Sequence, residues 1–249
     1  MNDFSWVTES LNTDGFAVIR EALDPAYCAK FGDEIIAEYD RLVDLGWRFS
    51  AGGRYTGHLN FHTGSSGLEL LKILENKNFV EIGERLLGRR LEVFHLFGNM
   101  NLPRSRPQDI HQDFAPPSES IVFNVTLVPT TYDNGATEIV PGSQCDRYSY
   151  RSLHRSGVLR NSQRLLSNPG DLVIRRGSVW HRGTSNTSST ARPMICISMV
   201  ANDLPKPISL ESDKIGFCAN RFYGKYARYR ELAEIYLRSP FHWYRMAKG

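Results

Sequence analysis

Short apolar runs separated by turn residues fill the second half of the chain, and they restrict this half to a β fold. Five such runs occur, at residues 91–97, 121–128, 136–140, 172–174 and 193–200. Asp-Asn-Gly and Pro-Gly-Ser stretches lie between them and are typical of tight turns. Several short strands joined by such turns predict an all-β sandwich or barrel core from about residue 91 to 202.

The first 90 residues have a different pattern, in which helices predominate. Residues 3–12 predict a short helix, and residues 16–20 predict a strand that follows the Asp14-Gly15 turn. Asp24-Pro25 begins a long helix, because Asp is a preferred N-cap and Pro is tolerated in the first turn. A further helix is predicted for residues 68–87. The helices are expected to pack on one face of the β core.

Two other segments complete the predicted organisation. Residues 50–67 are rich in glycine and contain His58 and His62, so they predict a loop, which is either an active-site lid or a surface connection with two solvated histidines. Apolar positions recur at helical spacing near the end of the chain and predict a helical segment over about 203–249. The prediction is one domain over residues 1–249, mainly β with flanking helices.

Composition excludes several classes of protein. Hydrophobic residues make up 41% and charged residues 23% of the chain, which are ordinary values for a globular domain, and the net charge of +3 is too small to argue for nucleic acid. The sequence begins without a basic and apolar leader, and no apolar run is long enough for a membrane helix. The four cysteines are far apart and form no CxxC pair, which favours reduced thiols. We therefore expect a cytoplasmic protein.

The triplet His111-Gln112-Asp113 is the first candidate for chemistry. Alternate residues of a strand project to the same side, so His111 and Asp113 can both point at one metal ion. A second histidine from a distant strand, His181, would complete a set of two histidines and one carboxylate. This set holds Fe(II) and leaves the opposite positions open.

Arg192 follows His181 by eleven residues, which is enough to cross a turn and return on the neighbouring strand. Its planar guanidinium can grip a carboxylate with two hydrogen bonds. Each of these features also has a non-functional interpretation when it is taken singly. His181 can be a buried neutral imidazole, Arg192 can form a surface ion pair, and the HxD triplet can occur by chance. Together and in this order they favour a metal site with an anion-binding arginine.

The same ordered set resembles the phytanoyl-CoA dioxygenase (PhyH) family of Fe(II)/2-oxoglutarate oxygenases. The resemblance covers roughly residues 4 to 200, and its matching stretches are residues 14–20, 111–113, 134–144 and 170–193. It implies a double-stranded β-helix, the jelly-roll or cupin-like fold, with iron at one mouth. It also implies a need for Fe(II), 2-oxoglutarate and O2.

Carried over to this chain, the resemblance implies a role for each matching residue. His111, Asp113 and His181 would bind iron, and Arg192 would hold the distal carboxylate of 2-oxoglutarate. Two further cosubstrate contacts fall on Asn101 (or Asn99) and on Asn124. Many family members carry a hydroxyl residue two positions after the distal histidine, whereas this chain has Gly183 there.

The implied reaction is oxidation of a small-molecule or carrier-linked metabolite, with release of succinate and CO2. Related halogenases replace the carboxylate ligand with a small residue, so the presence of Asp113 favours an oxygenase. Hydroxylation, desaturation, epimerisation and cyclisation all remain open, in a biosynthetic or natural-product pathway. The rivals are an acyl-CoA-type hydroxylase of lipid metabolism, a non-catalytic jelly-roll binding protein and a zinc hydrolase.

An arginine-rich stretch at residues 144–169 has Asp146 as its only acidic residue. It is either a solvated connection or a cap that attracts an anionic substrate or carrier group. The partners expected overall are a small-molecule substrate and neither nucleic acid nor membrane.

Overall fold

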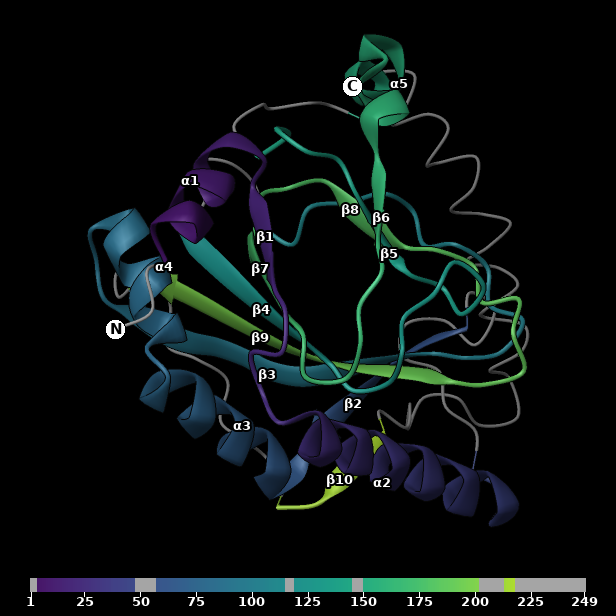
Figure 1. Ribbon diagram of the computed structural model, residues 1–249. Coiled ribbons are helices and arrows are strands. Elements are labelled where there is room, and N and C mark those ends of the chain that lie inside the picture. Colours follow the sequence, from purple (N-terminus) through teal and green to yellow (C-terminus); the bar gives the residue numbers. More distant parts are fainter. Residues whose placement is uncertain (1–3, 48–56, 115–118, 145–149, 202–212, 218–249) are drawn as a thin grey trace.

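Two antiparallel sheets form the core of the computed structural model (Figure 1), which describes residues 4–47, 57–114, 119–144, 150–201 and 213–217. The larger sheet has seven strands in the order β1-β7-β4-β9-β3-β2-β10. Their bounds are Phe16–Ile19 (β1), His58–Thr63 (β2), Leu91–Asn101 (β3), Ser120–Thr126 (β4), Leu172–Arg176 (β7), Arg192–Ala201 (β9) and Ile215–Phe217 (β10). The predicted strands at residues 91–97 and 193–200 are thus parts of longer strands.

The smaller sheet has three strands in the order β6-β5-β8 and lies opposite the larger one (Figure 1). Its strands are Thr137–Ile139 (β5), Gln163–Leu165 (β6) and His181–Gly183 (β8). The mainly β core with flanking helices that the sequence predicted is therefore present.

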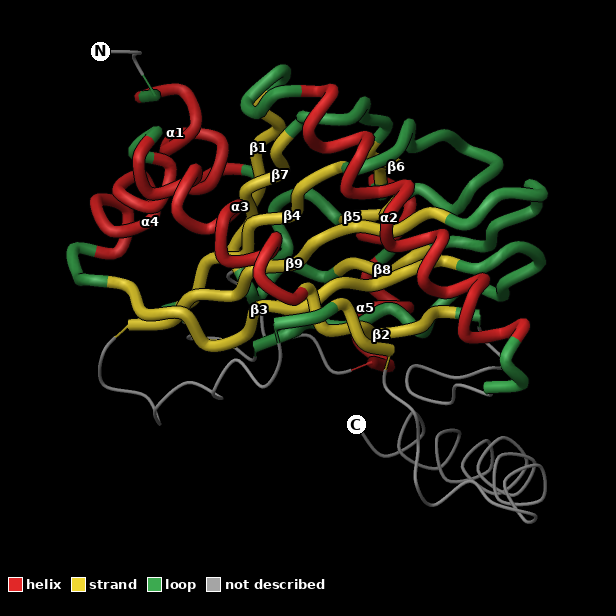
Figure 2. The backbone as a smooth tube through the Cα atoms, turned by 90° about the horizontal axis from the view of Figure 1, so that it is seen from below, coloured by secondary structure: helices red, strands yellow, loops and turns green. Residues whose placement is uncertain are grey.

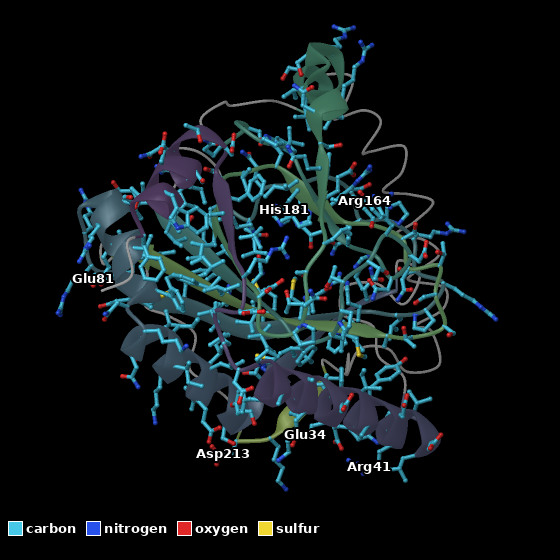
Figure 3. All side chains as sticks on the ribbon, in the orientation of Figure 1. Glu34, Arg41, Glu81, Arg164, His181 and Asp213 are labelled. Carbon is cyan, nitrogen blue, oxygen red and sulfur yellow. The ribbon has the colours of Figure 1, made fainter. Side chains whose placement is uncertain are left out.

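The helices of the described chain are Ser5–Thr13 (α1), Pro25–Asp44 (α2), Gly64–Asn76 (α3), Phe79–Leu87 (α4), Tyr150–Ser156 (α5) and the 3-10 turn Val158–Asn161 (η1). The Asp24 side chain accepts a hydrogen bond from the Ala26 amide at 2.9 Å, which is the predicted N-cap of α2. Helices α2 and α3 lie across the outer face of the larger sheet (Figure 2). Charged side chains such as Glu34 and Arg41 point outward from α2 (Figure 3).

The larger sheet separates its side chains by face, and this separation places the site. On β9, Ile195, Ile197 and Met199 belong to the apolar cluster beneath the helices. The alternate residues of the same strand face the smaller sheet, where Arg192 and Met194 share a pocket with residues of β5 and β6. Because successive side chains of a strand alternate faces, β9 supplies an apolar row to the helix side and places Arg192 between the two sheets.

Two expectations about the helical regions need correction. The predicted loop at residues 50–67 contains β2, a strand that pairs with β3. The helix predicted at residues 68–87 is two helices, α3 and α4, because Asn78 adopts the left-handed conformation with φ of 60° and interrupts the hydrogen bonding.

Most of the predicted C-terminal helical segment lies outside the described residues. Its described part, residues 213–217, contains the short strand β10. Among the described helices, none is long and apolar enough to cross a membrane.

Candidate functional site

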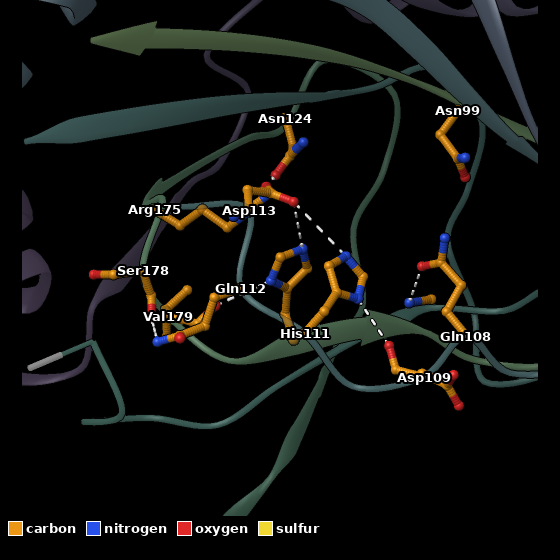
Figure 4. A network of polar contacts seen from close by, with 12 residues as sticks. Asn99, Gln108, Asp109, His111, Gln112, Asp113, Asn124, Arg175, Ser178 and Val179 are labelled. Carbon is orange, nitrogen blue, oxygen red and sulfur yellow. Dashed lines mark hydrogen bonds and ion pairs between the residues drawn. The ribbon is translucent and has the colours of Figure 1, made fainter. Parts of the chain in front are cut away.

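His111, Asp113 and His181 meet between the two sheets, as the sequence predicted. One nitrogen from each histidine and one carboxylate oxygen all lie within 4.8 Å of one another (Figure 4). Nε2 of His111 and Nε2 of His181 are each 3.7 Å from Oδ1 of Asp113. The two histidines also face each other across a β-bridge, in which each backbone amide donates to the other's carbonyl oxygen at 2.9 Å. The backbone thus brings together residues that are far apart in the sequence.

The histidine rings are held with Nε2 directed toward the centre of this cluster. Nδ1 of His111 is 2.8 Å from the carbonyl oxygen of Asp109, and Nδ1 of His181 is 3.0 Å from that of Val179. A carbonyl only accepts, so Nδ1 carries a proton in each ring, and Nε2 is the nitrogen that a neutral ring would offer to a metal. Such backbone contacts orient metal-binding histidines in known sites. The arrangement can therefore bind a cation.

The charge state of the cluster also suits a metal ion. Burial opposes ionisation of Asp113, but the Arg175 guanidinium, through its charge and its hydrogen bond, holds the pKa of this carboxyl well below the usual range. Burial, reinforced by Arg175, lowers the pKa of His181, so this ring is neutral at neutral pH. An ionised carboxylate at Asp113 and a neutral imidazole at His181 are the protonation states that metal ligands need.

Arg175 contacts the cluster directly, although its place in the sequence did not mark it as a site residue. It lies on β7 with 3% of its side chain exposed, and its Nη2 donates to Oδ2 of Asp113. This leaves Oδ1 as the carboxylate oxygen nearest the two histidines. The sequence signal for Arg175 was its position directly after the apolar run at residues 172–174. A second arginine follows it, and a pair of arginines at the end of a strand is equally typical of a solvated strand end.

Arg192 lies at the start of β9, opposite Asn101 on β3, and is only 2% exposed. Its Nε has no hydrogen-bond partner among the residues that the structure describes, and its Nη1 lies 3.9 Å from the sulfur of Met194. No salt bridge to Arg192 is found within the described ranges of the chain. Burial lowers the pKa of Arg192 to about 10, still far above neutrality. A buried cation without a counter-charge is costly, so this position is suited to an anion.

A narrow pocket connects Arg192 to the neighbourhood of the metal cluster. The residues that line it are Asn124, Thr126, Thr130, Thr137, Leu165, Ser167, Val173, Arg175, Arg192 and Met194. Two of them are arginines, and none is acidic. Three buried nitrogens on its lining residues have no hydrogen-bond partner in the described part of the chain: Nδ2 of Asn124, Nη1 of Arg175 and Nε of Arg192. A pocket with free donors and excess positive charge fits a carboxylate ligand.

The two asparagines predicted to contact the cosubstrate have different surroundings. Asn124 lies on β4 in the pocket, and its Oδ1 accepts from Nε of Arg175 at 3.0 Å. Asn101 is fully buried, and its amide nitrogen donates to the carbonyl oxygens of Thr184 at 2.9 Å and Gly135 at 3.4 Å. The polar atoms of Asn101 are thus engaged within the protein, and its contact with a cosubstrate stays a prediction.

Gly183 occupies the position at which many family members carry a hydroxyl residue. The space around it explains why no side chain is accommodated there. A Cβ atom on residue 183 would lie 2.6 Å from Cε1 of His58 and 3.0 Å from Oε1 of Gln108. Hydrogen bonds hold both neighbours in place. Nε2 of His58 lies 2.9 Å from the Arg106 carbonyl oxygen, and Oε1 of Gln108 accepts from the Gly183 amide at 2.8 Å. The imidazole of His58 therefore fills this space.

The arginine-rich stretch is partly described. Arg155, Arg160 and Arg164 are exposed, and the guanidinium of Arg164 lies 5.6 Å from the ring centre of Tyr132. Arg147 and the side chain of Arg151 lie outside the described residues. The described arginines face solvent, which is compatible with a solvated connection and with a cap for an anionic group.

Comparison with protein families and relatives gives a consistent result. Residues 11–194 match the family model described as phytanoyl-CoA dioxygenase (PhyH). Dioxygenase cdmA of Talaromyces verruculosus is 28% identical over 218 residues, which cover 77% of this chain and 71% of that protein. The uncharacterized protein Rv1501 of Mycobacterium tuberculosis is 26% identical over 199 residues, with 75% and 71% covered.

Solved structures share the fold. EctD from S. alaskensis, with 2-oxoglutarate and 5-hydroxyectoine, superimposes with a TM-score of 0.66 at 16% identity, over 84% of this chain and 81% of that one. The epimerase SnoN, in complex with Fe3+, alpha ketoglutarate and nogalamycin RO, gives a TM-score of 0.58 at 17% identity, over 80% and 83%. The double-stranded β-helix predicted from the sequence is confirmed.

Proposed function

The chain belongs to the phytanoyl-CoA dioxygenase (PhyH) family and is an Fe(II)- and 2-oxoglutarate-dependent dioxygenase, and from this premise we propose that it oxidises a small-molecule metabolite in a biosynthetic pathway. The observation that carries the proposal is the position of the metal cluster beside the pocket of free donors. Two histidines and one carboxylate are the ligand set of non-haem Fe(II) oxygenases. The adjoining pocket adds the means of holding an anionic cosubstrate.

Each residue has a defined part in the proposal. His111, Asp113 and His181 hold Fe(II) through Nε2, Oδ1 and Nε2, the three atoms that converge in the cluster. Arg192 binds the distal carboxylate of 2-oxoglutarate, because its buried guanidinium has no acidic partner among the described residues. Asn124 contributes its free amide nitrogen to the same ligand.

Bound iron, 2-oxoglutarate and O2 would supply the oxidising chemistry, in which O2 is the oxidant and decarboxylation of the cosubstrate to succinate and CO2 is coupled to attack on a C–H bond. The protein fixes the geometry in which that chemistry takes place. The His111–His181 bridge holds the two rings on one side, and the contact with Arg175 fixes the rotation of the Asp113 carboxylate. With Asp113 present, the carboxylate position is filled by the protein, which favours oxygenation over halogenation.

A biosynthetic role is supported by proteins of the same fold. They include the epimerase SnoN and the carbocyclase SnoK, both described as coming from nogalamycin biosynthesis. A cytoplasmic location is part of the proposal and is supported by the described cysteines, Cys28 and Cys196, which are buried free thiols. Hydroxylation, desaturation, epimerisation and cyclisation differ only in the steps after C–H attack, so substrate placement decides among them.

The test is anaerobic addition of Fe(II) and then 2-oxoglutarate, with visible absorption as the readout. We expect a weak charge-transfer band that requires both additions and is lost in His111→Ala. A matched control is His62→Ala, because His62 is an exposed histidine of β2 and is no part of the cluster. Absence of the band in folded wild-type protein would favour a non-catalytic binding protein or a zinc enzyme. Survival of the band in His111→Ala would falsify the assignment of His111 as an iron ligand. Succinate release measured across a metabolite panel then identifies the substrate.

A further inference from the structure

Arg175 has more donor capacity than its contacts within the protein use. Its Nε donates to Oδ1 of Asn124 at 3.0 Å, and its Nη2 donates to Oδ2 of Asp113. Its Nη1 is buried and has no hydrogen-bond partner among the described residues. A guanidinium carries five N–H groups in a rigid plane, so the end of Arg175 that bears Nη1 remains available. A buried donor that is left unpaired calls for an explanation.

The neighbouring amide has the same property. Asn124 uses its oxygen to accept from Arg175, and its amide nitrogen is buried without a hydrogen-bond partner in the described ranges. Asn124 and Arg175 line the same pocket, so their free nitrogens belong to one cavity. Since Arg175 also contacts Asp113, this end of the pocket is the end beside the metal ligands. Arg192 lines the same pocket, and its side chain has no hydrogen bond or ion pair with the cluster among the described residues.

The charges at the metal end also favour an anion. Asp113 is the single carboxylate that contacts Arg175 among the described residues, and a divalent cation would share that negative charge. With a cation bound, Arg175 would keep only part of its counter-charge in a buried setting. An anionic group next to the metal would restore the balance, because charge-assisted hydrogen bonds are strongest when both partners are ionised.

We propose that Arg175, together with the amide nitrogen of Asn124, binds the carboxylate of the 2-oxo acid group, which is the carboxylate of 2-oxoglutarate nearer to the metal. The hydrogen bond from Arg175 Nη2 to Oδ2 of Asp113 holds this side chain so that Oδ1 remains free for iron. This inference rests on the proposed function and adds a second carboxylate anchor to it. The pocket then has one guanidinium for each carboxylate: Arg175 recognises the 2-oxo acid group, and Arg192 recognises the distal carboxylate. Arg175 is thus both a binding residue and a positioning residue for a metal ligand.

The two arginines can be separated with two cosubstrates. 2-Oxoglutarate has both carboxylates, whereas 2-oxobutyrate has the 2-oxo acid group and lacks the distal carboxylate. Each acid is titrated anaerobically into the Fe(II) protein, and the charge-transfer band gives its dissociation constant. Iron affinity is measured separately by competition with a chelator. This design reads binding and does not depend on turnover.

We expect Arg175→Gln to weaken both acids by the same factor of about ten to a hundred, since it removes a charge-assisted contact that both acids make. Arg192→Gln should weaken 2-oxoglutarate alone and bring it to the level of 2-oxobutyrate. Arg175→Lys keeps the charge but loses the planar fork, so it should weaken both acids to an intermediate degree. This variant also keeps the test decisive if Arg175→Gln does not fold.

Three outcomes overturn the inference. Arg175 variants that bind both acids as the wild type does, with only iron affinity reduced, would leave Arg175 a support for Asp113 and nothing more. A selective loss of 2-oxoglutarate would place Arg175 at the distal carboxylate. If wild-type protein gives no band with either acid, the proposed function itself fails, and this result differs from both of the others.

Discussion

Substitution of Gly183 by alanine tests whether His58 fills the space beside the distal histidine. The new Cβ would lie 2.6 Å from Cε1 of His58, whereas ordinary carbon contacts are about 3.5–4.0 Å. His58 would have to move by about 1 Å to restore such a contact, yet it is fully buried and held by the Arg106 carbonyl oxygen. Overpacking of this kind costs about 1–3 kcal/mol, which outweighs the gain of about 0.4–1 kcal/mol from replacing a glycine.

The measurement is urea-induced unfolding of the metal-free protein, with a double-mutant cycle. Gly183→Ala should lower the free energy of unfolding by about 1–2 kcal/mol, and its cost should largely vanish in a His58→Ala background. Gly216→Ala is the matched control, because it is also a strand glycine and its nearest neighbouring atom is 4.0 Å away. Wild-type stability in Gly183→Ala, or additive effects of the two substitutions, would refute the steric explanation.

Two further predictions concern the titrating groups near the site. Burial lowers the pKa of His58 from 6.5 to about 4, so between these values the unfolded chain binds a proton that the folded protein excludes. The free energy of unfolding, measured with urea, should therefore fall as the pH falls from 6.5 to 4, and it should fall less in His58→Gln. An equal dependence on pH in the two proteins would contradict the assignment. Asp113→Asn leaves buried Arg175 without its ionised partner and should cost about 1.5–3 kcal/mol of unfolding free energy, whereas no loss would show that the pair is not stabilising.

The sequence predicted the parts of the fold whose signals are local. Apolar runs with turns between them predicted the strands of the core, and Asp24-Pro25 predicted the start of α2, since both patterns depend on neighbours a few residues away. β2 was missed because it includes polar residues and follows glycines. Its strand conformation comes from pairing with β3 and, on its other edge, with β10, which is a long-range effect that composition does not record.

The metal cluster was predictable for a similar reason. The two-residue spacing of His111 and Asp113 is a local signal. The expectation that Arg192 lies on the strand next to that of His181 was wrong, because β8 belongs to the smaller sheet and β9 to the larger one. The hydrogen bonds of Asn101 could not be predicted in the same way. They depend on Gly135 and Thr184, which are 34 and 83 residues away in the sequence.

Strand register, and not the local sequence, determines that Arg175 is buried. As a charged residue at the end of an apolar run it suggests a solvated strand end, and the neighbouring Arg176 suggests the same. Pairing of β7 with β4 decides the matter, because it places Val173 opposite Asn124 and sets Arg175 two residues further along on the same face. That face is turned toward the smaller sheet, so the side chain must be buried there. A buried arginine needs ionised or strongly polar partners, and its side chain donates to Asp113 and Asn124. The register of one strand pair therefore lets Arg175 link the Asp113 carboxylate to the pocket that Asn124 and Arg192 also line.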